Sequence, residues 1–231
     1  MGGNVNAELF DLDETLCERP RRPAERLTAA FDRAGVEPFF TAAEYHRLVD
    51  EVGGTDSDIR RRERCFELLA REYDRDETVG RQVADAYEAL TDYTAVEFLP
   101  GAERVLEAFE ETYRLGLVTN GGPDTQSPKI DALGIRERFE TVVLAGYDTP
   151  AKPDPTPFRT AMAELGVSPE RTIYVGNSLR SDIAGASASE IRSVWIPYGD
   201  VERPNRTQNG FEPDYTLESI EEALSRPWEG D

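Results

Sequence analysis

From residue 102 onward, short apolar segments typical of strands alternate with segments that have helical spacing. The helical segments at 125–133 and 157–165 are followed by Gly134 and Gly166, and glycine is the residue that most often ends a helix. This alternation predicts a parallel sheet with helices on both faces, an α/β fold of the Rossmann-like kind. The expected strands are 7–10, 115–118, 141–145, 172–175, 193–196 and 214–216, and further helices are expected at 102–109, 182–188 and 217–224.

Residues 20 to 95 show helical spacing throughout and contain no strand pattern. Thr41 and Glu44 have the spacing of a capping box at a helix N-terminus. Apolar residues recur at helical spacing in three other places, 27–34, 59–73 and 83–90. This part of the chain is therefore predicted to be a small helical bundle.

The helical bundle interrupts the α/β pattern, so two domains are expected in the 231 residues. Residues 1–16 and 97–231 are assigned to the α/β core, and residues 17–96 to an inserted helical cap. Glu8 lies within the first expected strand, and a charged residue is unusual in a strand that is buried on both faces. This strand is therefore expected to be partly exposed at its start.

The chain carries a formal net charge of −20, from 46 acidic and 26 basic residues. A surface this acidic repels nucleic-acid phosphates and anionic lipid headgroups, so neither nucleic acid nor a membrane is an expected partner. The acids are spread along the chain, which favours a solvated surface. Only Lys129 and Lys152 are lysines, a composition that resembles halophilic archaeal proteins. Full stability in dilute buffer, measured in a KCl titration, would contradict adaptation to high salt.

The two cysteines, Cys17 and Cys65, form no spaced framework and are expected to be free thiols. A disulfide between them is the alternative, although a reducing compartment disfavours it. The sequence contains no signal-peptide pattern and no apolar run near 18 residues. A cytoplasmic, soluble protein is therefore expected.

Four polar segments each follow an expected strand, where ligands bind in open parallel sheets. The first is Asp11-Leu12-Asp13, in which two carboxylates can point the same way, one to attack phosphorus and the other to handle a proton. The second is Thr119-Asn120-Gly121-Gly122, whose hydroxyl and backbone N–H groups suit a phosphoryl oxygen. Taken alone, both segments are also consistent with ordinary turns.

The third segment contains Lys152 in a proline-rich loop, where a cation can neutralise the charge of a transferring group. The fourth runs from Gly176 to Asp182 and offers oxygen ligands that suit Mg²⁺. The alternatives are a solvated surface lysine and a helix N-cap. However, Thr119, Lys152 and Asp182 are each separated by about one βαβ unit of roughly 30 residues. Strand ends at this spacing are expected to bring these side chains together.

Together these segments resemble the motifs of the haloacid dehalogenase superfamily. Its first motif, D-x-D-x-[TV], matches Asp11, Asp13 and Thr15. The second motif, a threonine or serine that ends a strand, matches Thr119, and the third, a lysine followed by proline, matches Lys152. The helical insertion between the first two motifs resembles the family's α-helical cap, which is expected to set substrate choice.

The resemblance implies a Mg²⁺-dependent phosphatase that hydrolyses a small-molecule phosphate monoester through an aspartyl-phosphate. Asp11 would attack phosphorus. Asp13 would protonate the leaving oxygen and then activate water. Thr119 and Lys152 would hold the phosphoryl oxygens, with Asn120 and Gly121 beside them.

The fourth motif, G-D-x-x-x-x-D, is matched only in part by Gly176 to Asp182. Asn177 stands where the family often has an acid that binds Mg²⁺ directly, and an amide oxygen brings no charge to the ion. Asp182 is expected to supply that charge, directly or through water. The expected ligands of Mg²⁺ are therefore Asp11, the backbone carbonyl of Asp13, Asn177 and Asp182. The run from Thr119 through Gln126 to Lys129 further resembles the branch with nucleotidases and sugar-phosphate phosphatases.

Two other interpretations stay open. A metal-free 2-haloacid dehalogenase also uses the first aspartate but attacks carbon, and Asp13 and Asp182 favour phosphate chemistry instead. A non-enzymatic binding protein on a similar core would not need this set of polar residues. His46 is the only histidine and lies in the helical insertion, so a Ser-His-Asp triad or a His-rich metal site does not fit. The sequence also contains no P-loop pattern, and it leaves the oligomeric state open.

Overall fold

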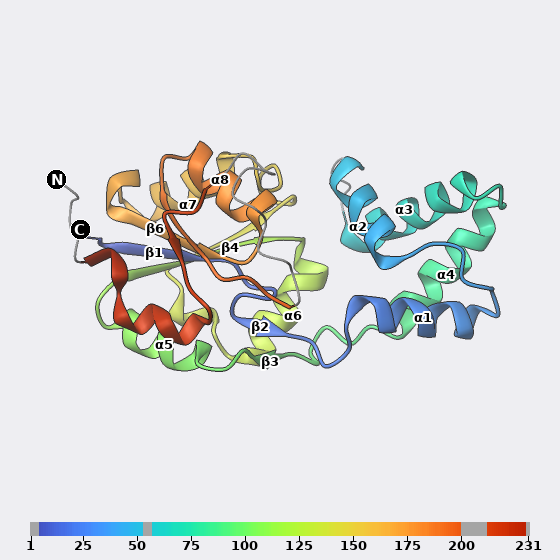
Figure 1. Cartoon of the computed structure of the whole chain (residues 1–231), viewed down its shortest axis with the longest axis horizontal. Helices are drawn as coiled ribbons and strands as arrows, with labels where there is room; N and C mark the ends of the chain where they lie inside the picture. The colour runs from blue at the N-terminus through green and yellow to red at the C-terminus, as the bar shows by residue number, and fades with distance from the viewer. Residues whose placement is uncertain (1–4, 53–56, 200–211, 230–231) are drawn as a thin grey trace. The chain divides into compact units, whose positions relative to one another are not determined.

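The computed structural model describes residues 5–52, 57–199 and 212–229. The chain forms two compact units, both drawn in Figure 1. The core unit combines Met1–Glu18 with Val96–Asp231, and the helical unit is Arg19–Ala95. At the edge of the core unit, β2 (Cys17–Glu18) and β3 (Glu97–Phe98) pair as a short antiparallel ribbon.

A six-stranded sheet lies at the centre of the core unit, in the order β5–β4–β1–β6–β7–β8. Each strand runs parallel to its neighbours. The chain moves outward from β1 on one side and then on the other, so the order reverses at the carboxyl end of β1. The sheet confirms the predicted α/β fold class. Its strands are β1 (Ala7–Phe10), β4 (Arg114–Asn120), β5 (Thr141–Ala145), β6 (Thr172–Gly176), β7 (Arg192–Trp195) and β8 (Tyr215–Thr216).

Helices cover both faces of this sheet (Figure 1). One apolar layer includes residues of α5 (Ala102–Glu110) and α6 (Pro123–Leu133), and the other includes residues of α7 (Thr156–Leu165) and α8 (Ala184–Ala188). Neighbouring residues of a strand point to opposite faces, so Leu9 of β1 packs in the second layer and Phe10 in the first. The two layers fix β1 in the middle of the unit.

Glu8 is fully buried, and the expectation that β1 is partly exposed at its start is wrong. Its carboxylate lies beside Trp228 and near Arg226. Burial raises the pKa of Glu8 well above its ordinary 4.5, and the charge of Arg226 only partly offsets this. A charged residue in a strand usually indicates exposure to solvent. Here Trp228, which lies far along the chain, packs in the apolar layer on the same face of the sheet and covers Glu8.

Glu8→Gln is expected to stabilise the protein relative to wild type as the pH rises. A carboxyl group whose pKa is higher in the folded than in the unfolded protein contributes stability that is fully present below the unfolded-state pKa. That stability is lost as the pH rises from the unfolded-state pKa to the folded-state pKa. The gain of Glu8→Gln should therefore begin near pH 4.5 and grow by up to about 1.4 kcal/mol per pH unit. Denaturant unfolding from pH 4 to 8 measures this. Glu137→Gln, at an exposed position, is the control, and a pH-independent difference for Glu8→Gln would refute the expectation.

Two segments predicted as α-helices adopt other helix types. The tail predicted as a helix at 217–224 is a 3₁₀-helix, Ile220–Ser225, in which Ile220 and Ala223 are buried three residues apart. The helix predicted at 182–188 begins earlier, with a π-helical turn at Leu179–Ile183 that leads into α8. In that turn the Ser178 carbonyl accepts the N–H groups of Asp182 (2.9 Å) and Ile183 (3.1 Å).

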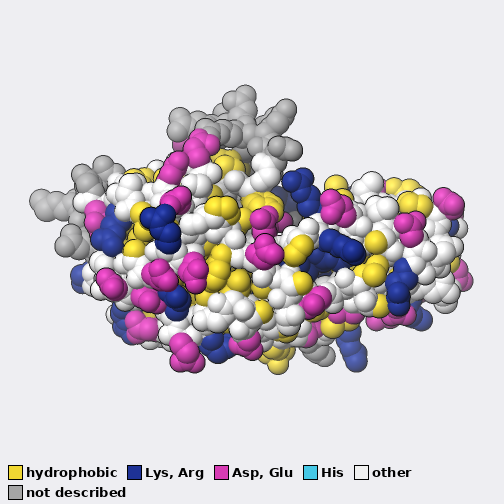
Figure 2. Space-filling model, turned by 90° about the horizontal axis from the view of Figure 1, so that it is seen from below, with side chains coloured by type: hydrophobic (Ala, Val, Ile, Leu, Met, Phe, Trp, Pro, Cys, Tyr) yellow, Lys and Arg dark blue, Asp and Glu magenta, His cyan; other side chains and the backbone are white. Residues whose placement is uncertain are grey.

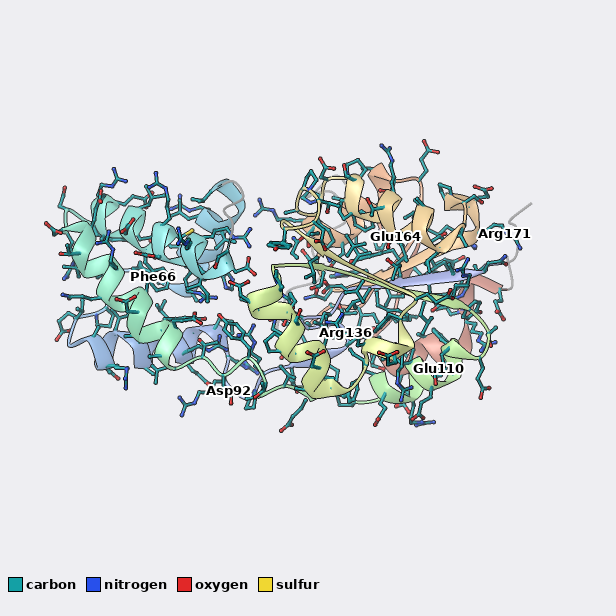
Figure 3. The ribbon with its side chains drawn as sticks, turned by 180° about the vertical axis from the view of Figure 1, so that it is seen from behind. Phe66, Asp92, Glu110, Arg136, Glu164 and Arg171 are labelled. Carbon is teal, nitrogen blue, oxygen red and sulfur yellow. The ribbon has the colours of Figure 1, made fainter. Side chains whose placement is uncertain are left out.

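The helical unit consists of α1 (Pro23–Ala34), α2 (Ala42–Glu51), α3 (Asp58–Glu72) and α4 (Glu77–Ala89). The predicted capping box is confirmed, since Glu44 N–H donates to Thr41 Oγ1 (3.3 Å) and Thr41 N–H donates to Glu44 Oε2 (2.8 Å). Phe66 lies inside the unit (Figure 3), and its ring packs edge-on against those of Phe40 and Tyr45. The unit thus has an apolar core of its own.

Acidic side chains and arginines are interspersed over the face seen in Figure 2, in keeping with the spread of charge along the chain. Cys17 and Cys65 are buried free thiols, as predicted. His46 is exposed on α2. Within the described ranges, no helix has both the length and the apolar character needed to cross a membrane.

Candidate active site

Asp11 follows directly after β1, at the carboxyl end of the sheet. Its N–H still donates to the Val175 carbonyl of β6 (3.0 Å), so its backbone continues the strand. The chain then turns around the Leu12 carbonyl, which accepts the N–H groups of Leu16 (3.0 Å) and Cys17 (3.2 Å). This turn holds the Asp11 side chain, which is only 9% exposed, at the point where the strand order reverses.

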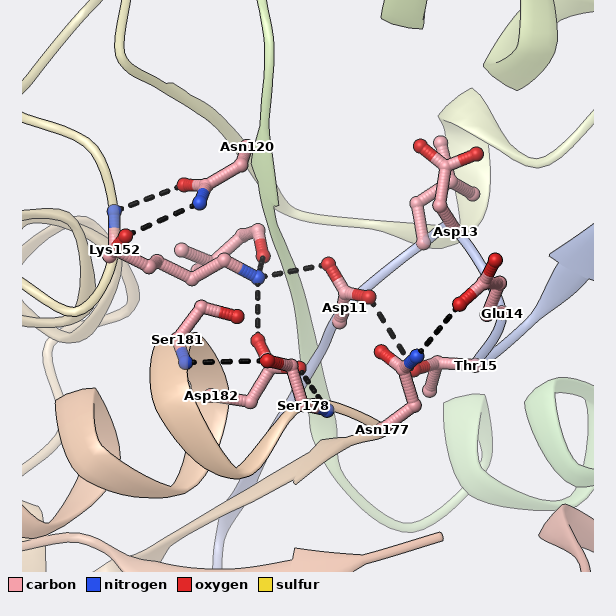
Figure 4. A network of polar contacts seen from close by, with 12 residues as sticks. Asp11, Asp13, Glu14, Thr15, Asn120, Lys152, Asn177, Ser178, Ser181 and Asp182 are labelled. Carbon is pink, nitrogen blue, oxygen red and sulfur yellow. Dashed lines mark hydrogen bonds and ion pairs between the residues drawn. The ribbon is translucent and has the colours of Figure 1, made fainter. Parts of the chain in front are cut away.

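Lys152 connects the polar segments that follow β1, β5 and β6 (Figure 4). Its Nζ lies 2.7 Å from Asp11 Oδ1 and 2.7 Å from Asp182 Oδ1. It also contacts the Tyr174 hydroxyl (2.7 Å) and the Val118 carbonyl (2.9 Å). With its side chain 2% exposed, Lys152 is no solvated surface lysine, and it places three segments of the chain around one ammonium group.

Asp182 faces Lys152 from the π-helical turn after β6. Its Oδ1 also lies 3.0 Å from the Tyr174 hydroxyl, and its Oδ2 accepts the Ser178 N–H (2.9 Å). Both carboxylate oxygens therefore have hydrogen-bond donors from the protein. Gly176 permits this approach, because a Cβ at position 176 would lie 2.6 Å from Asp182 Cβ.

The charges of this cluster are strongly coupled. Burial raises the pKa of Asp11, Lys152 opposes that shift, and Asp182 adds to it, so the net shift of the pKa is upward. For Lys152, burial alone would lower the pKa, but the two carboxylates outweigh it and raise the pKa. Two carboxylates thus face one ammonium group, and a further positive charge near Asp11 would be stabilising.

Thr119 is buried near the end of β4, and the two residues after it shape the neighbouring loop. Asn120 Oδ1 accepts the Lys152 N–H (2.8 Å), and Asn120 Nδ2 donates to the Lys152 carbonyl (3.2 Å). The Gly121 N–H donates to the Ala145 carbonyl (2.8 Å). Asn120 therefore fixes the backbone of Lys152, and the phosphate contacts predicted for Thr119, Asn120 and Gly121 stay predictions.

Asn177 lies on the other side of Asp11. The Thr15 hydroxyl is 3.3 Å from Asp11 Oδ2 and 3.5 Å from Asn177 Oδ1. Asn177 Nδ2 donates to Glu14 Oε2 (3.1 Å), which leaves the amide oxygen on the side of Asp11. Asp11 Oδ2 therefore lies on the side of Thr15, which also contacts Asn177, whereas Asp11 Oδ1 lies on the side of Lys152.

Asp13 does not join this cluster. Figure 4 shows its carboxylate turned away from Asp11, Lys152 and Asp182. Lys129 Nζ of α6 contacts both of its oxygens, Oδ1 at 2.7 Å and Oδ2 at 2.5 Å. Gln126 Nε2, also on α6, donates to Oδ2 (3.2 Å). The two aspartates of the first motif thus face two different lysines.

The sequence matches the model of a protein family, the haloacid dehalogenase-like hydrolases, over residues 5–189. The chain belongs to this family. The chain is similar to a glyceraldehyde 3-phosphate phosphatase of Methanopyrus kandleri, to which it is 31% identical over 95% of this chain and 96% of that protein. Another, of the same name and from Pyrococcus furiosus, is 31% identical over 84% of this chain and 82% of that protein.

Solved structures of similar fold agree with this assignment. One is described as a predicted phosphoglycolate phosphatase from Haemophilus somnus. It superposes with a TM-score of 0.71 at 22% sequence identity and covers 96% of this chain and 97% of its own. The similarity shows that the two chains share a fold over nearly their whole length.

The oxygen atoms beside Asp11 fit a hard divalent cation. Asp11 Oδ2 and Asn177 Oδ1 both lie within 3.5 Å of the Thr15 hydroxyl, so a carboxylate and an amide oxygen converge there. Across the described part of the chain, no cluster of three or more His, Cys, Asp or Glu side chains is arranged to hold a metal. Mg²⁺ does not need such a cage, since it is commonly held by one or two carboxylates, waters and substrate phosphates.

Sequence reasoning did not assign roles to three side chains that shape this site. Tyr174 was part of an apolar strand pattern, yet its hydroxyl contacts Lys152 and Asp182. Gln126 and Lys129 appeared only as marks of a family branch, yet both bind Asp13. A usable signal existed for Tyr174, because a buried tyrosine hydroxyl normally has a hydrogen-bond partner.

Proposed function

We propose that this protein is a phosphatase that hydrolyses a small-molecule phosphate monoester, with Asp11 as its nucleophile. The observation that carries the proposal is the ammonium group of Lys152, which lies 2.7 Å from both Asp11 and Asp182 in a buried site at the carboxyl end of the sheet. Such a cation can hold a phosphoryl oxygen next to a carboxylate that would otherwise repel it. The family assignment and the phosphatase names of the relatives support the same chemistry.

The reaction has two steps in this proposal. In the first, an Asp11 oxygen attacks phosphorus, the ester P–O bond breaks, and the leaving oxygen takes the proton of Asp13. In the second, water attacks the same phosphorus and gives a proton to Asp13, while phosphate leaves and the Asp11 carboxylate is restored. Lys152 and the Thr119 hydroxyl hold the phosphoryl oxygens in both steps.

We further propose Mg²⁺ as the cofactor, held by Asp11, Asn177 and the backbone carbonyl of Asp13. When bound, it would neutralise the charge between Asp11 and the phosphoryl group. Asp182 would act through Lys152, because both of its oxygens already accept hydrogen bonds from the protein. This arrangement brings fewer negative charges to Mg²⁺ than an aspartate at position 177 would.

Asn177→Asp is therefore expected to tighten Mg²⁺ binding about tenfold or more, because the added charge lies close to the ion. The measurement is the Mg²⁺ concentration that gives half-maximal activity. Asp182→Asn is the matched control, and it should lower kcat while it leaves that concentration nearly unchanged. An unchanged value in Asn177→Asp with a large rise in Asp182→Asn would show that Asp182 is the charged ligand.

A panel of phosphate monoesters tests the proposed activity and its substrate. Since two relatives are named glyceraldehyde 3-phosphate phosphatases, we propose a small ester of this kind as the substrate. The panel holds glyceraldehyde 3-phosphate, phosphoglycolate, phosphoserine and nucleoside 5′-monophosphates, each with and without Mg²⁺. Highest kcat/KM on a small ester supports the proposal. Chloride release from 2-chloropropionate, with no phosphate release from any ester, would favour the dehalogenase alternative.

A further inference from the structure

The first motif holds two aspartates, and the chain has only two lysines, Lys129 and Lys152. Each lysine binds one of those aspartates, Lys152 to Asp11 (2.7 Å) and Lys129 to Asp13 (2.7 and 2.5 Å). All other cationic side chains, apart from the single histidine, are arginines. An ammonium group is a compact point charge, whereas a guanidinium is a planar fork, so each lysine places a small cation directly against one carboxylate.

Lys129 is held by more than the ion pair. Its side chain is 1% exposed, and its Nζ also donates to Gln126 Oε1 (3.1 Å). Gln126 Nε2 in turn donates to the Asn120 carbonyl (2.9 Å) and to Asp13 Oδ2 (3.2 Å). Because Asn120 also fixes the backbone of Lys152, one chain of contacts links the supports of both aspartates. Burial of an ammonium group costs desolvation free energy, and the attraction of the Asp13 carboxylate offsets part of that cost.

Asp13 occupies the open side of the site. Its side chain is 38% exposed, against 9% for Asp11 and 1% for Asp182. In the proposed reaction the phosphoryl group lies on the inner side with Lys152, so the leaving oxygen lies on the side from which the ester enters. An exposed carboxylate on a short side chain would otherwise sample several rotamers there.

We infer that Lys129, with Gln126 as its second anchor, is the positioning residue for Asp13. This inference rests on the proposed phosphatase activity and deepens it. Lys129 holds the carboxylate in one orientation at the mouth of the core site, so that Asp13 meets the leaving oxygen and later the attacking water. The rival view is an ion pair that stabilises α6 against the loop after β1 and has no effect on proton transfer.

Leaving-group dependence separates the two views. An alkyl ester needs a proton on its leaving oxygen, whereas p-nitrophenyl phosphate releases a stable anion. The ratio kcat/KM reports the steps up to loss of the leaving group, so it isolates proton delivery from the later breakdown of the intermediate. A misplaced proton donor should therefore slow the alkyl ester far more than the aryl ester.

The experiment compares wild type, Lys129→Met and Lys129→Arg on glyceraldehyde 3-phosphate and p-nitrophenyl phosphate. Methionine fills similar apolar space, and solvent can reach the released Asp13 carboxylate, so the fold should persist. We expect kcat/KM for the alkyl ester to fall about tenfold to a hundredfold in Lys129→Met. The aryl ester should change less than threefold, and Lys129→Arg should recover part of the loss. Ile130→Val, a buried change on the same helix, controls for general loosening of α6 and should leave both ratios unchanged.

Equal losses on both esters, no loss at all, or a gain in Lys129→Met would each overturn the inference. Gln126→Met is a second test. Its kcat/KM should fall less than that of Lys129→Met, and again mainly for the alkyl ester. If wild type hydrolyses neither p-nitrophenyl phosphate nor any ester of the panel with Mg²⁺ present, the proposed function fails and the role of Lys129 in it fails with it. If wild type is active but Lys129→Met leaves the ratio of kcat/KM values for the alkyl and aryl esters unchanged, the inference fails and the proposed function stands.

Discussion

Asp11→Asn is expected to abolish hydrolysis of every phosphate monoester that the wild type accepts. An amide is no nucleophile toward phosphorus, and loss of a nucleophile costs other enzymes about 10⁴-fold or more in kcat. The fold should survive, because asparagine has the same shape and Lys152 keeps its contact with Asp182 at 2.7 Å. Phosphate release and a thermal unfolding midpoint, both measured on the same preparation, check the two parts of the expectation.

Asp11→Ala controls for slow deamidation of the asparagine, which would restore Asp11. Both variants should be inactive at the start of the assay. During prolonged incubation at neutral pH, only Asp11→Asn can regain activity, because only its asparagine can deamidate to aspartate. Activity in freshly prepared Asp11→Ala would show that Asp11 is not the nucleophile. A stable fold in both variants ensures that the loss of activity comes from the missing carboxylate.

Lys152→Met is expected to remove activity and also to destabilise the core unit. The variant leaves the Asp11 and Asp182 carboxylates buried and close together without the cation between them. Removal of one partner from a buried ion pair typically costs about 3–5 kcal/mol of unfolding free energy. Loss of the group that holds the phosphoryl oxygens should lower kcat by about 10³-fold.

A second substitution separates these two effects. Lys152→Met combined with Asp182→Asn removes the repulsion between the carboxylates and should regain part of the lost unfolding free energy. Activity should not return, because the phosphoryl group still lacks its cation. Recovery of both stability and activity in the double variant would show that Lys152 serves only to hold the fold. Denaturant unfolding and phosphate release measure the two quantities.

Much of the site could be predicted because a parallel sheet converts position along the chain into position in space. Asp11 and Asp182 each follow a strand, and the carboxyl ends of those strands meet at one edge. Lys152 follows β5 at the same edge. The alternation of strands and helices was therefore enough to predict both the fold class and the neighbourhood of these three side chains.

The direction in which individual side chains point was not accessible in the same way. Lys129 lies in a helix, and whether a helical residue faces solvent or a carboxylate depends on how that helix docks. Tyr174 reaches Lys152 because its ring packs against Phe158, 4.7 Å between centroids, from a helix on one face of the sheet. The burial of Glu8 could not be predicted, because the residue that covers it, Trp228, comes from a distant part of the chain. Each of these contacts depends on tertiary packing, which sequence spacing does not determine.

The most direct test of Asp11 as the nucleophile is to trap the phosphorylated enzyme. Wild type is mixed with a radiolabelled phosphate monoester and Mg²⁺, quenched in acid within one turnover, and digested. The expected result is a phosphoryl group on the peptide that contains Asp11, released by neutral hydroxylamine as an acyl phosphate, and absent from Asp11→Asn. Label on a serine or threonine that resists hydroxylamine, or turnover with no labelled protein at any quench time, would contradict it.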